Sequence, residues 1–272
     1  MPELPEVETI ARGLTNYLLN KRIAAVDIRC NKIVNGDEES FRRSICGRKI
    51  EKIYRHGKYL FLLLSPEPAV SIHLRMSGQL YLSGYESMPD KHTHLDFYFQ
   101  NYNKKLSYRD IRKFGRLEII PKGDISGYIR RKKLGPDALE INRSSLSTAL
   151  KSSKRSLKAL LLDQSLLAGL GNIYVDEILF LAGFLPFSTG NKLTGRQIEK
   201  LFNSTSEVLQ QAIKNRGTTL SDFIDVHGKQ GSNQFSLMVY GRAGKPCAKC
   251  RQPIIKTKVN GRGTHYCAFC QR

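Results

Sequence analysis

The sequence predicts an α+β protein with an N-terminal helix, an antiparallel β-sandwich, a helical domain and a C-terminal zinc finger hairpin. Strand-like stretches fill the first half, helical apolar spacing begins near residue 157, and two Cys-x-x-Cys pairs close the chain. Because 272 residues exceed one typical domain of about 150, more than one domain is expected. The predicted division is 1–133 for the sandwich domain, 134–153 for a linker, 154–237 for the helical domain and 238–272 for the zinc finger.

The first residues predict an amphipathic helix. Pro5 suits a first helical turn, and Glu6 and Glu8 complement the positive end of the helix dipole. The residues expected on its buried side are Leu4, Val7, Ala11, Leu14 and Leu18. These features explain the segment without any catalytic role.

The second residue offers a chemical interpretation as well. Methionine before proline is normally removed, which would leave Pro2 as a secondary amine at the chain end. An α-amino group has a pKa of about 8, against about 10.4 for lysine, so much more of it is unprotonated at neutral pH. Such an amine can attack a sugar carbon and form an iminium, and Glu3 beside it could transfer protons.

Short apolar or alternating stretches, separated by Gly, Asn, Asp or Pro, dominate the first half. Stretches of this kind favour an antiparallel sandwich or barrel. The expected strands span 23–30, 49–54, 58–64, 69–74, 79–83, 94–99, 104–107 and 116–120.

The second half changes to helical spacing. Helices are expected from Leu157 to Leu162, over 173–184, and after Thr194, which forms a capping-box pattern with Gln197. The polar stretch before them contains Gly135 and Pro136, so the linker is placed there.

The four C-terminal cysteines predict one structural zinc ion. Cys247 and Cys250 are separated from Cys267 and Cys270 by sixteen residues, which suits two tight turns that share a tetrahedral metal. Alternation over 253–259 and turn residues over 260–263 predict a hairpin between them. Four thiolates leave no open coordination position, so the zinc is expected to be structural.

The charge balance predicts a polyanionic partner. The chain has 44 Lys and Arg against 24 Asp and Glu, a formal charge of +20, and residues 226–272 contain no acidic residue. Counterion release favours contacts between such a surface and phosphates. A membrane surface would be the competing polyanion, but no apolar run of about 18 residues and no secretory N-terminus is present. We therefore expect an intracellular nucleic-acid-binding protein with no membrane partner.

Seven segments stand out in chain order. They are Pro2–Thr9, Gly57–Leu60, His73–Gly78, Lys91–His94, Asp110–Gly115, Gly169–Tyr174 and the cysteine hairpin with Gly261–Gly263. Together they resemble the formamidopyrimidine-DNA glycosylases, bifunctional repair enzymes that remove oxidised purines and cleave the abasic strand. The resemblance covers nearly the whole chain. It implies a monomer that acts on double-stranded DNA in a bacterial-type cytoplasm.

The resemblance implies catalytic roles for four residues. Pro2 resembles the Schiff-base nucleophile, and Glu3 resembles the acid that protonates the deoxyribose ring. Lys58 is similar to a lysine assigned to β-elimination, and Arg262 to an arginine assigned to δ-elimination. Glu6 matches a supporting position, although a role with the helix dipole alone explains it equally well.

The same resemblance implies DNA contacts. A base inside a duplex must be extruded before excision, and Met76, Arg112 and Phe114 match the wedge that fills the vacated stack. Positions that bind phosphates are matched by His92, Arg112, Lys154 and Asn172. The helical domain resembles a helix–two-turns–helix element, and 216–236 resembles a loop that closes over the extruded purine.

Three departures and two rival functions stay open. His56 and Thr93 stand where the family commonly has other residues. Arg251 stands where glycine is usual, so a strained or slightly re-formed first zinc turn is expected. One rival is a sister enzyme of the same fold that prefers oxidised pyrimidines. The other is a non-catalytic zinc-containing nucleic-acid-binding protein.

Overall fold

The structure is a computed structural model that describes residues 1–272, and the chain forms two units. The first unit contains residues 1–132 and 215–232, and the second contains residues 133–214 and 233–272. No helix combines the length and the apolarity that a membrane crossing requires.

The first unit is a two-sheet sandwich with a helix inside it. One sheet has the strand order β1-β7-β8-β6, and the other has the order β2-β9-β5-β4-β3. The strands are β1 Ile23–Ile28, β2 Val34–Asn35, β3 Lys49–His56, β4 Tyr59–Ser65, β5 Ala69–His73, β6 Gly78–Gly84, β7 Thr93–Phe99, β8 Lys104–Asp110 and β9 Arg116–Ile120. All eight predicted strands are confirmed, and every pairing is antiparallel except the two-residue β2–β9 pair.

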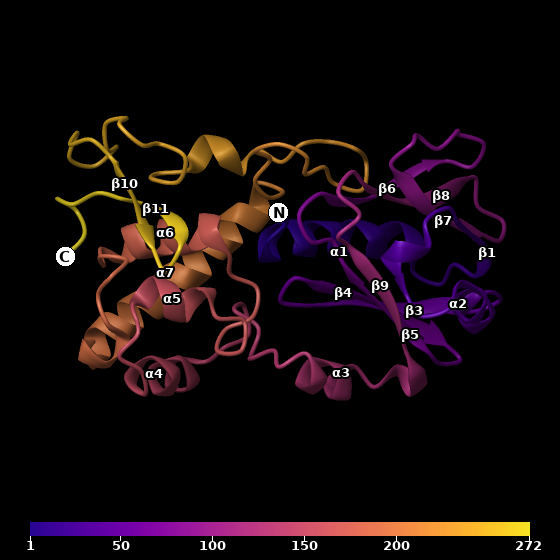
Figure 1. The fold of residues 1–272 in the computed structure, drawn as a ribbon, viewed down its shortest axis with the longest axis horizontal. Helices are drawn as coiled ribbons and strands as arrows, with labels where there is room; N and C mark the ends of the chain where they lie inside the picture. Colours follow the sequence, from indigo (N-terminus) through magenta and orange to yellow (C-terminus); the bar gives the residue numbers. More distant parts are fainter. The chain divides into compact units, whose positions relative to one another are not determined.

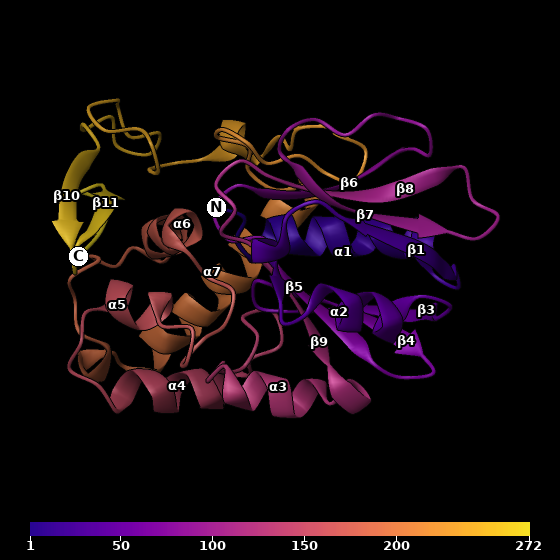
Figure 2. The same ribbon diagram turned by 45° about the vertical axis from the view of Figure 1, so that its right-hand side comes forward.

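The helix α1 (Leu4–Leu18) lies between the two sheets, as Figure 2 shows. Its residues Val7, Ile10 and Leu14 pack in one apolar cluster with side chains from both sheets, such as Leu60 and Phe97. The predicted buried side of this helix is therefore confirmed. Burial of these side chains fixes the position of the N-terminus within the unit.

Shorter elements complete the first unit. They are η1 Asn31–Ile33, α2 Glu38–Ile45, η2 Pro121–Gly123 and α3 Ile125–Arg131. The returning segment 215–232 is also part of it, because Phe223 and Val226 are buried in the same apolar cluster and the Leu82 amide donates to the Val226 carbonyl at 2.8 Å.

The second unit is helical and ends in the cysteine hairpin (Figure 1). Its elements are α4 Arg143–Lys151, α5 Leu157–Leu162, α6 Asn172–Ala182, η3 Gly190–Lys192, α7 Gly195–Lys214, η4 Asn233–Ser236, β10 Ile255–Val259 and β11 Arg262–Tyr266. The predicted capping box is present, since the Thr194 amide donates to Gln197 Oε1 at 2.8 Å and the Gln197 amide donates to Thr194 Oγ1 at 3.3 Å.

The segment 134–153, expected as a linker, contains α4 and lies in the second unit. Asn142 caps this helix by accepting a hydrogen bond from the Ser145 amide at 2.9 Å. Leu146 and Leu150 are buried, and α4 packs against α7. Two leucines in a serine-rich stretch are a weak sequence pattern for a helix. The division of the chain into functional domains stays a prediction.

Candidate functional site

The N-terminus of α1 holds two buried carboxylates directly after Pro2. The Glu3 amide donates to Glu6 Oε2 at 2.8 Å, and the Glu3 side chain in turn accepts from the Glu6 amide. Glu6 also accepts from the Thr218 amide through Oε1 at 2.7 Å. Both carboxyl groups lie at the positive end of the helix dipole. Glu6 is therefore more than a dipole partner, because it ties the start of α1 to the segment 215–232.

Lys58 follows the turn between β3 and β4. Gly57 in that turn has a φ of 56°, a left-handed conformation that favours glycine. The Lys58 side chain is only 8 % exposed, so it is not a strand-end lysine in water. The ring of Tyr59, the next residue, meets the ring of His73 edge to face at 4.4 Å.

His73 at the end of β5 is held neutral. Burial, followed by the charges of Arg75 and Lys58, lowers the pKa of His73 to about 3. Its Nδ1 accepts a hydrogen bond from the Arg75 amide at 3.0 Å, which only an unprotonated nitrogen can do. The neutral ring thus fixes the start of the turn that carries Met76.

This low pKa predicts an acid-sensitive fold. Unfolded histidine has a pKa of about 6.5, so the unfolded chain binds the extra proton first as the pH falls. The free energy of unfolding should then decrease between about pH 6.5 and pH 3, with a slope of up to about 1.4 kcal/mol per pH unit from this group. Urea unfolding at several pH values measures the slope, and His73→Gln should reduce it over the same range.

The three residues matched to the wedge lie on two neighbouring turns after β5 and β8. Met76 is 42 % exposed and Phe114 is 49 % exposed, so neither is a core residue. The Arg112 guanidinium lies 4.9 Å from the centre of the Phe114 ring. Exposed apolar side chains beside a cation suit insertion into a base stack.

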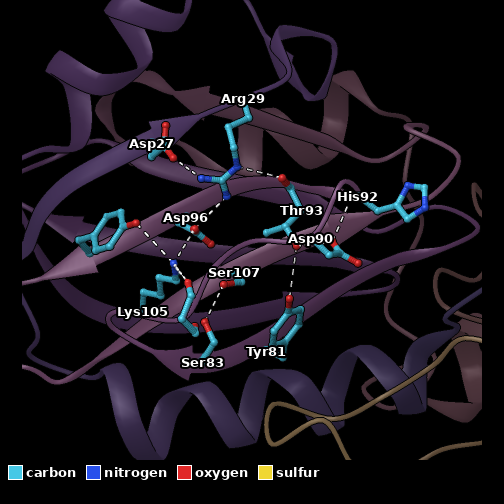
Figure 3. A network of polar contacts seen from close by, with 12 residues as sticks. Asp27, Arg29, Tyr81, Ser83, Asp90, His92, Thr93, Asp96, Lys105 and Ser107 are labelled. Atoms are coloured by element: carbon cyan, nitrogen blue, oxygen red, sulfur yellow. Dashed lines mark hydrogen bonds and ion pairs between the residues drawn. The ribbon is translucent and has the colours of Figure 1, made fainter.

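Asp90 organises the turn that carries His92 (Figure 3). Its Oδ1 accepts from the His92 amide at 3.0 Å and from Thr93 Oγ1 at 2.7 Å, and its Oδ2 accepts from Arg109 Nε at 2.7 Å. Although partial burial raises it, hydrogen bonds from Thr93 and Arg109 lower the pKa of Asp90 to about 2. The turn is thus held in place while the His92 ring points away from the sheet.

In the second unit a buried ion pair positions the hairpin strand β11. Lys158 Nζ donates to Asp176 Oδ1 at 2.6 Å and to the Gly263 carbonyl at 2.9 Å. The same carbonyl accepts from Asn172 Nδ2 at 2.9 Å, and the His265 amide donates to Asp176 Oδ2 at 2.8 Å. These bonds hold the backbone of Gly263, the residue after the exposed Arg262, against α5 and α6.

Sequence reasoning did not single out the Lys158–Asp176 pair. The sequence does contain one signal, because Lys158 interrupts the apolar run of α5 and a lysine among leucines can indicate a buried ion pair. In the structure Lys158 is fully buried. Lys154, which the resemblance matches to a phosphate-binding position, lies in the exposed connection before α5. Asn172 opens α6, and its side-chain amide bonds the hairpin.

The four cysteines gather as zinc requires. Their Sγ atoms all lie within 4.8 Å of one another, with Cys247 and Cys270 at 3.9 Å and Cys250 and Cys267 at 3.4 Å. Four thiolates at about 2.3 Å from a tetrahedral zinc would lie about 3.8 Å apart. The donor set therefore fits one structural zinc ion. The predicted hairpin is confirmed as β10 and β11.

The backbone amides in the first cysteine turn favour a thiolate. Although burial raises it, hydrogen bonds from the Cys250 and Lys249 amides lower the pKa of Cys247 to about 7. Arg251, where glycine was expected, adopts a left-handed φ of 67°. Of the two expected outcomes, a strained turn and a re-formed one, this φ favours strain, since a side chain in the left-handed region costs about 1–2 kcal/mol.

Comparisons with known proteins agree with this arrangement. Residues 1–117 match the formamidopyrimidine-DNA glycosylase N-terminal domain, residues 134–224 match the H2TH domain of the same enzymes, and residues 244–272 match a zinc finger found in FPG and IleRS. A Streptococcus mutans formamidopyrimidine-DNA glycosylase is 43% identical over 275 residues, covering 100% of both chains.

Solved structures give the same result. The wild-type Lactococcus lactis enzyme in complex with a N7-benzyl-Fapy-dG containing DNA is 37% identical, covers 100% of both chains and has a TM-score of 0.93. A complex of the same enzyme with an oxidised-pyrimidine containing DNA has a TM-score of 0.92 at 37% identity, again covering 100% of both chains. The chain belongs to the formamidopyrimidine-DNA glycosylase family.

Proposed function

We propose that this protein excises oxidised purines, such as 8-oxoguanine and formamidopyrimidines, from duplex DNA and then cleaves the abasic strand, with Pro2 as nucleophile. Membership of the family makes it a DNA repair glycosylase, and abasic-site lyase activity is part of the family's function. The observation that best supports the mechanism is the buried Glu3–Glu6 pair directly after Pro2.

The Pro2 nitrogen, freed by removal of Met1, attacks C1′ of the damaged nucleotide while Glu3 protonates the ring oxygen. The C1′–O4′ bond opens, and the N-glycosidic bond breaks with its electrons passing to the base, which leaves with the proton lost from the Pro2 nitrogen. An iminium thus forms between Pro2 and C1′ of the opened sugar. The iminium accepts electrons during β-elimination of the 3′ phosphate, which Lys58 assists, and Arg262 assists the following δ-elimination. Bound by the four cysteines, zinc would stabilise the hairpin that carries Arg262 and would supply no chemistry to these steps.

DNA binding follows from charge and from the two exposed turns. A formal charge of +20 favours phosphate contacts, and we assign such contacts to His92, Arg112, Lys154 and Asn172. Met76, Arg112 and Phe114 fill the stack from which the nucleotide is extruded.

Covalent trapping tests this function. Borohydride should reduce the iminium to a stable adduct on duplexes that contain 8-oxoguanine, and Pro2→Gly should abolish the adduct. No adduct on any oxidised duplex would favour a non-catalytic DNA-binding protein. Preferential release of oxidised pyrimidines would instead favour the sister enzyme. An oxidised pyrimidine is also the lesion in one of the Lactococcus lactis complexes.

Replacement of Lys58 should slow the chemistry without unfolding the protein. Lys58→Ala removes one charge beside the β3–β4 turn, and loss of a positioned acid or base typically costs about 100-fold or more in rate. Single-turnover strand cleavage measures the effect, with Lys52→Ala on the exposed face of β3 as the matched control. Equal rates for the two variants would remove Lys58 from the site.

We further propose that the protein works in the bacterial cytoplasm, associated with the nucleoid through DNA binding. The relatives reported above come from bacteria. Its functional parts, on this proposal, are a catalytic sandwich over 1–133, a connection over 134–153, a helix–two-turns–helix part over 154–237 and a zinc finger over 238–272.

A further inference from the structure

Asp110, at the end of β8, is the most highly bonded carboxylate of the first unit outside the α1 N-terminus. Its side chain is 0 % exposed. Oδ1 accepts from Ser77 Oγ at 2.6 Å and from the Arg112 amide at 3.1 Å. Oδ2 accepts from the Gly115 amide at 2.8 Å and from the Tyr108 hydroxyl at 3.2 Å.

These bonds join two turns that are far apart in sequence. Ser77 belongs to the turn after β5, and Arg112 and Gly115 belong to the turn after β8. Ser77 Oγ also accepts from the Arg112 amide at 3.2 Å, so this single hydroxyl bonds both the carboxylate and the opposite turn. The two turns therefore share one hydrogen-bonded centre.

The surroundings of this centre leave little room for rearrangement. A Cβ added to Gly115 would lie 1.6 Å from the Tyr108 hydroxyl, and one added to Gly78 would lie 2.9 Å from it. His94 Nε2 lies 2.8 Å from the Asp110 carbonyl. Close packing thus holds the centre from several sides.

The turns also adopt costly backbone conformations. Arg75 has a φ of 55° and Lys113 has a φ of 56°, and each left-handed residue with a side chain is unfavourable. Such conformations persist where surrounding bonds enforce them, and they occur often at ligand-binding sites. The exposed side chains that these turns present are Met76, Arg112 and Phe114.

We propose that Asp110, together with Ser77, is a positioning residue that fixes both turns as one preformed wedge. This inference rests on the proposed role of Met76, Arg112 and Phe114 in base extrusion. A wedge that is already ordered does not lose conformational freedom when it enters the stack, so extrusion becomes easier. Asp110 touches no reacting atom and acts only through the two turns.

The effect should be confined to extrusion. Asp110→Asn keeps the size of the side chain but replaces one of its two acceptor oxygens with an NH2 donor and removes the charge, and Ser77→Ala removes only the bridging hydroxyl. Single-turnover excision of 8-oxoguanine from a duplex should fall roughly ten- to hundredfold in both variants, since each change breaks hydrogen bonds at a buried carboxylate that joins the two turns. Cleavage of a preformed abasic site in a single strand, where no stack must be opened, should change less than about threefold.

Two reference variants separate the possible outcomes. Met76→Ala must also lose duplex excision selectively, and if it does not, the proposed wedge itself is wrong. Asp96→Asn serves as the stability control, because Asp96 is equally buried in the same sheet but bonds Arg29 and Lys105 instead of the turns (Figure 3). It should lower the melting temperature without a selective loss of duplex excision.

A fluorescent 2-aminopurine next to the lesion reports the opening of the stack directly. Binding of the native protein should increase its fluorescence, and Ser77→Ala and Asp110→Asn should slow that increase by the same factor as excision. The inference is overturned if Met76→Ala is defective while Ser77→Ala opens and excises at the native rate. It is equally overturned if both substrates are affected alike. Ser77→Ala decides the question if Asp110→Asn does not fold.

Discussion

A form of the protein with any residue retained ahead of Pro2 is expected to lose covalent trapping and strand cleavage while it still binds DNA. In such a chain the Pro2 nitrogen is part of an amide, whose lone pair is delocalised and cannot attack C1′. Removing the nucleophile of a covalent mechanism typically lowers the rate at least about a thousandfold. Binding should persist, because the charge of +20 and the exposed turns are unchanged.

The matched pair for this experiment differs only at the chain start. One preparation carries a short extension before Pro2 that cannot be removed. The other carries the same extension followed by a protease site, so that cleavage exposes Pro2 as the first residue. Mass spectrometry verifies the first residue of each. Borohydride adducts and single-turnover cleavage are then compared on an 8-oxoguanine duplex. Full activity with Met1 still attached would contradict a Pro2 nucleophile.

Strand positions could be predicted closely because burial imposes local periodicity. The continuous apolar run of β4, and Val26 and Ile28 on either side of the exposed Asp27 in β1, mark residues that face a core, and turn residues separate the strands. The zinc finger was predictable for a different reason. Metal ligation needs particular residue types at fixed spacing, and Cys247, Cys250, Cys267 and Cys270 meet that requirement directly.

Elements that depend on tertiary contacts were harder to predict. The helix α2 has only Phe41 and Ile45 buried, and α4 has only Leu146 and Leu150, so neither pattern stands out from a polar loop. Their helical form depends on caps and on packing against neighbours. The place of segment 215–232 beside α1 depends likewise on the long-range bond between Glu6 and the Thr218 amide.

Buried polar groups are the remaining features of the structure that the sequence did not predict. Nothing in the local sequence shows that Asp110 will accept four hydrogen bonds, or that Lys158 and Asp176 will pair inside the second unit. Such groups occur only where all partners are assembled by the fold, because an unpaired buried charge is very costly. Motifs were thus enough to propose residues that act on DNA, whereas the buried groups that support them required the structure.

Loss of one zinc ligand is expected to have the second largest effect. Cys267→Ser leaves three thiolates and a weak hydroxyl ligand, and structural zinc contributes on the order of 10 kcal/mol to folding of such small elements. The hairpin β10–β11 has few other internal supports, since most of its first strand is exposed. Zinc content should fall below one ion per chain, and Arg262 should lose its fixed position.

DNA binding and δ-elimination should then fail together in Cys267→Ser. Fluorescence anisotropy with an abasic duplex should show at least about a tenfold weaker affinity, because the cationic hairpin no longer presents its charges in one arrangement. Arg262→Ala should instead keep zinc and lose chiefly the δ-elimination product. Cys46→Ser is the matched control, since this half-buried thiol lies in the first unit and belongs to no metal cluster. Normal DNA affinity in zinc-free Cys267→Ser would place the hairpin outside the DNA interface, because only a surface that contacts phosphates loses affinity when its order is lost.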